Sequence, residues 1–231
     1  MDINKFIKKH EKSLNYSGGG RKQHFQLIIE KLVALNKPLT IIETGTLWAP
    51  LDTPMGGFTY IFGDLIKNYT GGKLITIDIN SKHIENAKQS TKEFQDVIEY
   101  VTSDSVKHLE SMNDNEIEEV DLFYFDSYDF SSSDPIPSQL HHFRELSAVY
   151  KRLSKNVILS VDDNLPPGCW MDEIISDGNG KIISEKIIHG TPPNRWFGKG
   201  TLIDCFLTSE GWERINTYDK PSMQVLTYIL P

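Results

Sequence analysis

The stretch LTIIETG, residues 39–45, decides the fold of this 231-residue chain. Its residues up to Glu43 are mostly aliphatic or β-branched, and Gly45 follows, a pattern typical of a buried strand that ends in a turn. Similar runs recur at residues 73–79, 97–101, 120–125 and 156–161. Because helical patterns separate these five runs, the sequence predicts an α/β fold whose parallel sheet is wound by right-handed crossovers.

The helices are predicted from apolar spacing and from their end signals. Residues 21–36 place Phe25, Ile28 and Leu32 on one face, and Gly71-Gly72 stops the helix after the first strand. The chain closes with one more helix and a hairpin of two strands. The predicted helices span residues 21–36, 58–69, 81–94, 104–112, 137–153 and 201–210, and the hairpin strands span 212–218 and 224–229.

The composition limits the kinds of partner. Lys and Arg total 24 against 32 Asp and Glu, which gives a net charge of −8 and a pI near 5.4. A non-specific nucleic-acid binder needs a basic face to neutralise phosphates, so this balance disfavours one. No window approaches about 18 uninterrupted apolar residues, and the polar, lysine-rich start of the chain shows no secretory signal.

The chain length and the cysteine content limit the number of domains and the kinds of cysteine site. The chain has two cysteines, Cys169 and Cys205. One domain can span residues 1–231, and two cysteines make neither a disulfide framework nor a zinc site. We expect a cytoplasmic protein that acts on a small molecule, with no nucleic-acid or membrane partner; homo-oligomer formation stays open. Residues 164–198, with four prolines, are predicted to form a lid.

Acidic residues stand at the ends of all five predicted strands. In an open parallel sheet, ligands bind outside the carboxyl ends of the strands. Each carboxylate there needs water, a hydrogen-bond donor or a cation, because an unpaired buried carboxylate is costly. The pattern therefore predicts a polyhydroxylated, cationic or metal-bound ligand. The residues are Glu43, Asp78, Asp104, Asp126 and the pair Asp162-Asp163.

Two glycine-containing turns flank the first strand and the next helix, ETGT at 43–46 and GGFT at 56–59. Glycine lets the backbone approach a ligand, and a helix N-terminus offers free amides to a carboxylate or phosphate. Such turns also serve NAD, FAD and nucleotide sugars, and a tight turn without a ligand is the alternative. Asp78 stands where a carboxylate accepts both hydroxyls of a ribose, with helix capping as its alternative role.

Several motifs along this sheet resemble those of one enzyme family. ETGT at 43–46, TIDI at 76–79, TSDS at 102–105, and YFDSYDF at 124–130 followed by SVDDN at 160–164 look like a class I S-adenosylmethionine-dependent methyltransferase. Among these, the metal-dependent O-methyltransferases of the catechol and macrocin type are most similar. The resemblance covers residues 39–164. It implies a Rossmann-like, seven-stranded, mostly parallel sheet with one antiparallel edge strand and helices on both faces.

The resemblance also implies roles for single residues. Glu43 would lie near the methionine amine of S-adenosyl-L-methionine, Thr59 near its carboxylate, and Asp78 at its ribose. An inserted segment at 47–55, absent from the family's compact glycine loop, leaves open whether Thr46, Trp48 or Thr59 touches the cofactor. The full cofactor-binding set predicted in this way is Glu43, Gly45, Thr46, Gly57, Thr59, Asp78, Ser103, Asp104, Ser105, Asp126 and Tyr128, with residues 103–105 around the adenine.

A metal site is predicted at Asp126, Asp162 and Asp163. Their strands are expected to be adjacent, and three close carboxylates cannot all stay ionised without a cation or a shared proton. Such hard oxygen ligands suit Mg2+ or another divalent cation, which in the similar family chelates two substrate hydroxyls. The alternative is that Asp163 caps the loop and Asp126 only orients the cofactor.

A general base is predicted at Asp129, three residues past Asp126, where the catechol-type enzymes place a lysine; a simple turn residue is the alternative. Lys199 and Arg195 could meet an acidic substrate group or face water. The segment before Arg21 could be a gate or an ordinary helix lead-in. Of His141 and His142, only one can face the sheet.

The sequence thus predicts Mg2+-dependent O-methylation of a small polyhydroxylated acceptor, such as a sugar or natural product. The alternatives are a metal-independent N- or C-methyltransferase, a non-catalytic methyltransferase-like binding domain, and a nucleotide-sugar or dinucleotide enzyme. The last is disfavoured because no Gly-x-Gly-x-x-Gly fingerprint and no P-loop follow a strand.

Overall fold

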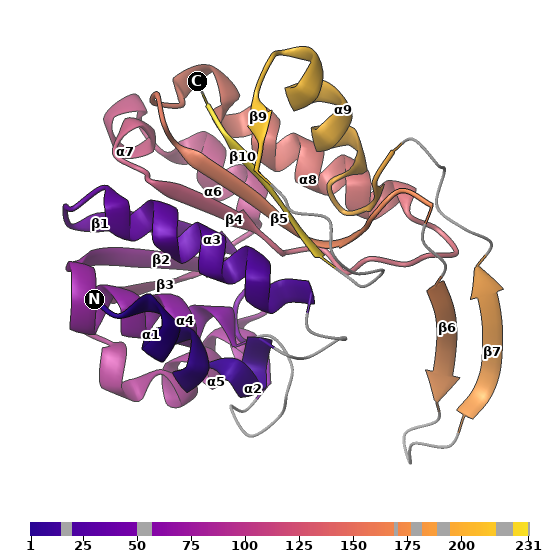
Figure 1. The fold of residues 1–231 in the computed structure, drawn as a ribbon, viewed down its shortest axis with the longest axis horizontal. Helices are drawn as coiled ribbons and strands as arrows, with labels where there is room; N and C mark the ends of the chain where they lie inside the picture. The colour runs from indigo at the N-terminus through magenta and orange to yellow at the C-terminus, as the bar shows by residue number, and fades with distance from the viewer. Residues whose placement is uncertain are drawn as a thin grey trace.

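A mixed sheet forms the middle of the molecule (Figure 1). The computed structural model describes residues 1–14, 20–49, 57–168, 171–176, 182–188, 195–215 and 224–230. In this part of the chain the sheet has eight strands in the order β3-β2-β1-β4-β5-β10-β9, with β8 beside β5. The strands are β1 (Leu39–Thr44), β2 (Gly72–Asp78), β3 (Ile98–Thr102), β4 (Leu122–Phe125), β5 (Ile158–Leu165), β8 (Phe197–Gly198), β9 (Glu213–Arg214) and β10 (Gln224–Ile229).

The predicted α/β class and parallel pairing are confirmed. The first five strands run parallel, and β10 pairs antiparallel with β5. The reversed strand is not the outermost one, because the short β9 pairs antiparallel with β10 beyond it. The sheet also has one strand more than the predicted seven, since Phe197 and Gly198 pair with the end of β5.

Helices cover both faces of the sheet, and β4 shows why. Its four residues alternate between the two cores: Leu122 and Tyr124 belong to one cluster, Phe123 and Phe125 to the other. The helices are α1 (Ile3–Lys9), α2 (Glu11–Leu14), α3 (Gly20–Ala34), α4 (Phe58–Leu65, continued by a π turn at Ile66–Thr70), α5 (Ser81–Ser90), α6 (Ser105–Ser111), α7 (Asp114–Glu118), α8 (Ile136–Val149) and α9 (Thr201–Ser209).

The polar N-terminal segment, which showed no apolar core in sequence, forms two short helices and belongs to the domain. Phe6, Ile7 and Leu14 are buried against the α3–α4 side of the sheet. The Nε2 atom of His10 lies 2.7 Å from the buried carboxylate of Asp64 in α4. Three apolar side chains and one buried polar contact therefore anchor this segment.

The predicted lid contains regular structure. β6 (Met171–Ser176) and β7 (Ile182–Ile188) form an antiparallel pair that stands apart from the central sheet, at the right of Figure 1. β5 also runs four residues beyond its predicted end at 161, because its last two residues pair with β8. Residues 177–181 and 189–194 of the lid, 50–55 of the inserted segment and the turn at 219–222 lie outside the described residues. Among the described residues, no helix is long and apolar enough to span a membrane.

Candidate active site at the carboxyl edge of the sheet

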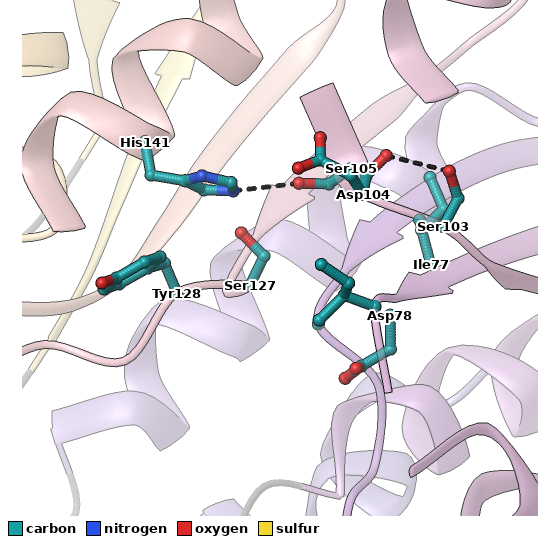
Figure 2. A pocket seen from close by; sticks show the side chains of 10 residues that line it. Ile77, Asp78, Ser103, Asp104, Ser105, Ser127, Tyr128 and His141 are labelled. Carbon is teal, nitrogen blue, oxygen red and sulfur yellow. Dashed lines mark hydrogen bonds between the residues drawn. The ribbon is translucent and has the colours of Figure 1, made fainter. Parts of the chain in front are cut away.

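A pocket of about 220 Å³ opens at the ends of β1, β2 and β3 (Figure 2). Pockets for small molecules usually have volumes of about 300–1,000 Å³, so this pocket suits part of a cofactor rather than all of it. Most of the residues predicted for the ribose and adenine line it. The lining residues are Gly45, Ile77, Asp78, Ile79, Ser103, Asp104, Ser105, Ser127, Tyr128 and His141.

Gly45 brings the first turn against the end of β4. Its φ is +79°, and a Cβ there would lie 2.4 Å from the carbonyl oxygen of Asp126. Only glycine fits both the left-handed backbone and this close approach. The turn after β1 and the loop after β4 are thereby held side by side at the pocket.

Asp78 ends β2, and its carboxylate contacts two backbone amides and a histidine. Oδ1 accepts a hydrogen bond from the backbone amide of Asn80 at 2.7 Å, and Oδ2 lies 3.4 Å from the amide of Thr46 and 3.2 Å from His83. Helix capping, the alternative role for Asp78, belongs to Asn80, whose side chain accepts from the amide of Lys82. Asp78 therefore keeps acceptor capacity toward the pocket.

The far wall of the pocket comes from α6 and α8. Asp104 caps α6 by accepting from the amide of Lys107, and Ser105 lies 3.0 Å from Nε2 of His141. Figure 2 shows His141 pointing at Ser105, with Tyr128 beside it. The ring centroids of Tyr128 and His141 are 5.5 Å apart. Sequence reasoning had left the histidine pair undecided; here His141 lines the pocket and His142 is buried.

Glu43 lies behind the turn and is buried. Its Oε2 accepts hydrogen bonds of 2.7 Å from the hydroxyls of Thr59 and Thr76. Burial raises the pKa of Glu43 to about 7, and the two hydroxyl bonds only partly oppose this rise. Thr59 also accepts from the amide of Leu47. Burial thus favours the neutral form of the Glu43 carboxyl, and the two hydroxyl donors partly stabilise its ionised form.

The predicted Gly57 has a packing role in this conformation. It precedes α4, and a Cβ there would lie 3.0 Å from the hydroxyl of Ser13. Tyr128 is 47 % exposed, and the next residue, Asp129, is exposed too. Asp129 has no hydrogen bond or ion pair within the part of the chain that the structure describes. Its assignment as the base stays a prediction.

The three carboxylates predicted to bind metal converge on two cations of the chain itself. Lys199 Nζ lies 2.5 Å from Asp126 and 2.9 Å from Asp163. Arg21 donates from Nε to Asp162 at 3.0 Å and from Nη2 to Asp163 at 2.5 Å. Figure 1 places α3, which carries Arg21, and the end of β5 in the same part of the molecule.

The opposite charges in this cluster stabilise the ionised forms of Lys199 and Asp163. Burial disfavours the ammonium of Lys199, but the carboxylates around it outweigh that effect and raise its pKa. Burial alone would raise the pKa of Asp163, yet Lys199 and Arg21 hold it below the usual value. Burial and the neighbouring acids raise the pKa of Asp126 in spite of Lys199. Three acids thus share two cations, and Asp126 is less stabilised as an anion than Asp163.

This arrangement does not fit the predicted magnesium ion. A divalent ion needs several free carboxylate oxygens. Both oxygens of Asp163 and one oxygen each of Asp126 and Asp162 are already paired with Lys199 or Arg21, although the other oxygen of Asp162 is buried without a hydrogen-bond partner among the described residues. Within the described residues, no group of three or more His, Cys, Asp or Glu is arranged to hold a metal. The prediction rested on the need for a counter-charge, and it overlooked the two cations that supply one.

Arg21 and Lys199 are the residues that sequence reasoning underrated. Both stand next to glycines, in GGGR at 18–21 and GKG at 198–200. Glycines beside a basic residue indicate that the backbone comes close to another group, but the sequence does not identify that group. Asn164 holds the turn at residues 198–200, since its Oδ1 accepts from the amide of Gly200 at 2.7 Å.

No protein-family model matches this chain, and no curated protein matches it. Among solved structures, it is similar to a possible exported protein from Bordetella parapertussis at 13 % identity and a TM-score of 0.55, covering 91 % of this chain and 68 % of that one. The N-methyltransferase NodS from Bradyrhizobium japonicum WM9 is 12 % identical with a TM-score of 0.48, covering 100 % and 99 %. An O-methyltransferase from Bacillus cereus in complex with SAH is 15 % identical with a TM-score of 0.47, covering 87 % and 79 %. The first likeness supports the fold, and at these identities none assigns a function.

Proposed function

We propose that this protein is an S-adenosyl-L-methionine-dependent methyltransferase that methylates an oxygen of a small polyhydroxylated acceptor. The observation that carries the proposal is the pocket at the ends of β1, β2 and β3, which Asp78 and Gly45 help to line. A carboxylate at the end of the second strand is suited to a ribose diol. The strand order also puts a second acidic edge, at β4 and β5, directly beside this pocket.

In this proposal the cofactor lies along the edge from β1 to β3. Asp78 accepts the ribose hydroxyls, and residues 103–105 surround the adenine beside His141. Glu43 faces the methionine amine, where a positive charge stabilises the ionised form of its carboxylate. Thr46 and Thr59 stand between Glu43 and Asp78 in the hydrogen-bond network.

Methyl transfer is a displacement in which the acceptor oxygen attacks the methyl carbon, the carbon–sulfur bond breaks and S-adenosylhomocysteine leaves. The oxygen loses its proton to a base, for which we propose Asp129. Its exposed carboxylate follows the loop that packs against Gly45, near the expected position of the methyl group. Proximity and orientation at this edge supply the remaining acceleration.

The acceptor is expected to carry no negative charge. Three carboxylates at the ends of β4 and β5 share two cations, so the cluster repels a phosphate or carboxylate group. A sugar-like acceptor with several hydroxyls meets both donors and acceptors there without an uncompensated charge. No step of this proposal runs through a divalent cation, which sets it closer to the metal-independent alternative.

Two measurements test the proposal. Calorimetry is expected to show binding of S-adenosylhomocysteine by the purified chain, and no comparable binding of NAD or of a nucleotide sugar. Transfer of labelled methyl from the cofactor to a panel of hydroxylated acceptors, with and without chelator, tests turnover. Tight binding without turnover across hydroxyl, amine and carbon acceptors would favour the non-catalytic alternative, and absence of binding would reject the methyltransferase.

A further inference from the structure

Lys199 is a buried cation to which the proposed methyl transfer gives no role. Its side chain is 1 % exposed, although lysine is rarely buried unless it is paired. Its ammonium lies between two carboxylates from different strands, Asp126 at 2.5 Å and Asp163 at 2.9 Å. The lysine therefore joins the end of β4 to the end of β5.

The chain delivers this ammonium through a constrained turn. Gly198 has a φ of +151°, and a Cβ there would lie 2.2 Å from the carbonyl oxygen of Asp163. The amide of Lys199 donates to that same carbonyl at 3.2 Å, and the amide of Gly200 donates to Asn164. The turn is thus held against the last residues of β5, so the lysine has little freedom to leave.

Arg21, in α3, is the second cation that neutralises these carboxylates. Its side chain spans Asp162 and Asp163, and the planar guanidinium can bind two carboxylates with a fixed geometry. Asp163 is shared by both cations and has a φ of +52°, an uncommon conformation for a residue other than glycine. The backbone at Asp163 is held in the form that presents its carboxylate to both.

We propose that Lys199 is the resident cation of the acceptor site: its ammonium holds the place between Asp126 and Asp163 that a divalent ion would need. That an acceptor binds at this cluster rests on the proposed function. The exclusion of a divalent ion depends only on the charges of the cluster. Lys199 is a positioning residue. It fixes the two carboxylates beside the acceptor, and its own charge excludes a second cation from the same oxygens.

Replacement of Lys199 tests this directly, with Mn2+ as the probe. Lys199→Gln removes the charge and leaves an uncharged side chain one atom shorter, so the carboxylates of Asp126 and Asp163 become available. We expect the wild-type protein to show no Mn2+ binding at this site by electron paramagnetic resonance or calorimetry, and Lys199→Gln to bind Mn2+. The melting temperature of the variant, and not of the wild type, should rise with Mn2+.

Two further variants serve as controls. The double variant Lys199→Gln, Asp126→Asn removes one positive and one negative charge, and it should fold without Mn2+ and fail to bind it. Lys155→Ala, which removes an exposed lysine, should behave as wild type. If Lys199→Gln is unfolded alone, recovery of the folded state on adding Mn2+ supports the proposal.

Three outcomes would overturn the inference. One is Mn2+ binding by the wild type that Asp163→Asn abolishes, and another is failure of Lys199→Gln to take up Mn2+ under any condition, including failure to fold with it. A third is uptake of Mn2+ by the double variant as strongly as by Lys199→Gln. None of these results depends on S-adenosylhomocysteine, so the inference can fail while the methyltransferase assignment stands, and the reverse.

Discussion

The carboxyl edge of the sheet has acidic residues in both its halves, at β1 and β2 in the first and at β4 and β5 in the second, and the groups that contact these carboxylates differ. At the ends of β1 and β2, Glu43 and Asp78 are held by hydroxyls, backbone amides and one histidine. At the ends of β4 and β5, Asp126, Asp162 and Asp163 are held by an arginine and a lysine. Neutral donors leave a carboxylate able to receive a charged ligand, whereas a buried ion pair is already compensated.

This difference separates two tasks that a strand-end carboxylate can have. The first half is prepared to bind a ligand that brings positive charge and hydroxyl donors. The second half holds the geometry of two strands and the helix α3 together before any ligand arrives. We therefore expect substitutions in the second half to affect stability first, and substitutions in the first half to affect binding first.

The largest expected effect is on stability, from Arg21→Met. The substitution leaves Asp162, whose side chain is 1 % exposed, without its cation. Removing one partner of a buried ion pair costs about 3–5 kcal/mol, because the remaining charge is uncompensated. Urea unfolding should show this loss, while Lys22→Met, next in sequence but in a half-exposed pair with Glu11, should lose at most about 1 kcal/mol. Equal losses would contradict the stabilising role of the buried ion pair between Arg21 and Asp162.

The next effect is on turnover, from Asp129→Asn. The carboxylates of the cluster are engaged by cations, so the proton acceptor is expected outside it, at an exposed group. Loss of a general base lowers kcat by about 10²–10⁴-fold. S-adenosylhomocysteine affinity and the unfolding curve should stay at wild-type values. Asp134→Asn, an exposed acid in the same loop, is the matched control. A wild-type kcat in Asp129→Asn would move the base to another residue.

The sequence predicted the sheet well because strands buried on both faces need apolar runs, and such runs are visible without tertiary information. It also placed Glu43, Asp78 and Asp126 at or directly beside strand ends, since chain order and parallel pairing fix where those ends meet. Asp162 and Asp163 were expected at a strand end too, but they lie inside β5, which continues to Leu165. The short β8 was not predictable, because its two residues, Phe197 and Gly198, form a strand only through pairing with β5. The N-terminal helices were missed for a related reason: their few apolar residues become a face only against α3 and α4.

The sequence could not predict which cations neutralise the carboxylates at β4 and β5. Arg21 lies 141 residues from Asp162, and Lys199 lies 73 residues from Asp126. A charge at such a separation is read as solvent-facing unless the fold is known. The prediction of a metal ion followed from counting three acids without the two bases that fold onto them. Charge balance at a site is a tertiary property, unlike the identity of a strand end.

A smaller effect, on binding, is expected from Asp78→Ala. A charge-assisted hydrogen bond lost from a ligand costs about 1.5–3 kcal/mol, which is about 10- to 150-fold in the dissociation constant of S-adenosylhomocysteine. Calorimetry measures the change, and urea unfolding should show a much smaller loss than for Arg21→Met. Asp96→Ala, in an exposed pair with Lys67, is the control. Unchanged affinity in folded Asp78→Ala would contradict the ribose assignment.

The smallest effect is a pH dependence of binding that Glu43 imposes. Burial raises the pKa of Glu43 to about 7, so below that pH the free protein holds this carboxyl protonated. A ligand with an ammonium group binds the ionised form, and each pH unit below 7 therefore weakens binding by up to about tenfold. Affinity for S-adenosylhomocysteine should rise from pH 6 to about 7.5 and then level.

Glu43→Gln separates this effect from pH-dependent stability. A raised carboxyl pKa stabilises the folded state at low pH, and that contribution is lost as pH rises from the unfolded value to about 7, the opposite direction to the affinity. In Glu43→Gln the affinity should be weaker and independent of pH over the same range, measured by calorimetry in buffers of matched ionic strength. A pH profile that survives in Glu43→Gln would assign the titration to another group and leave the methionine amine without its proposed partner.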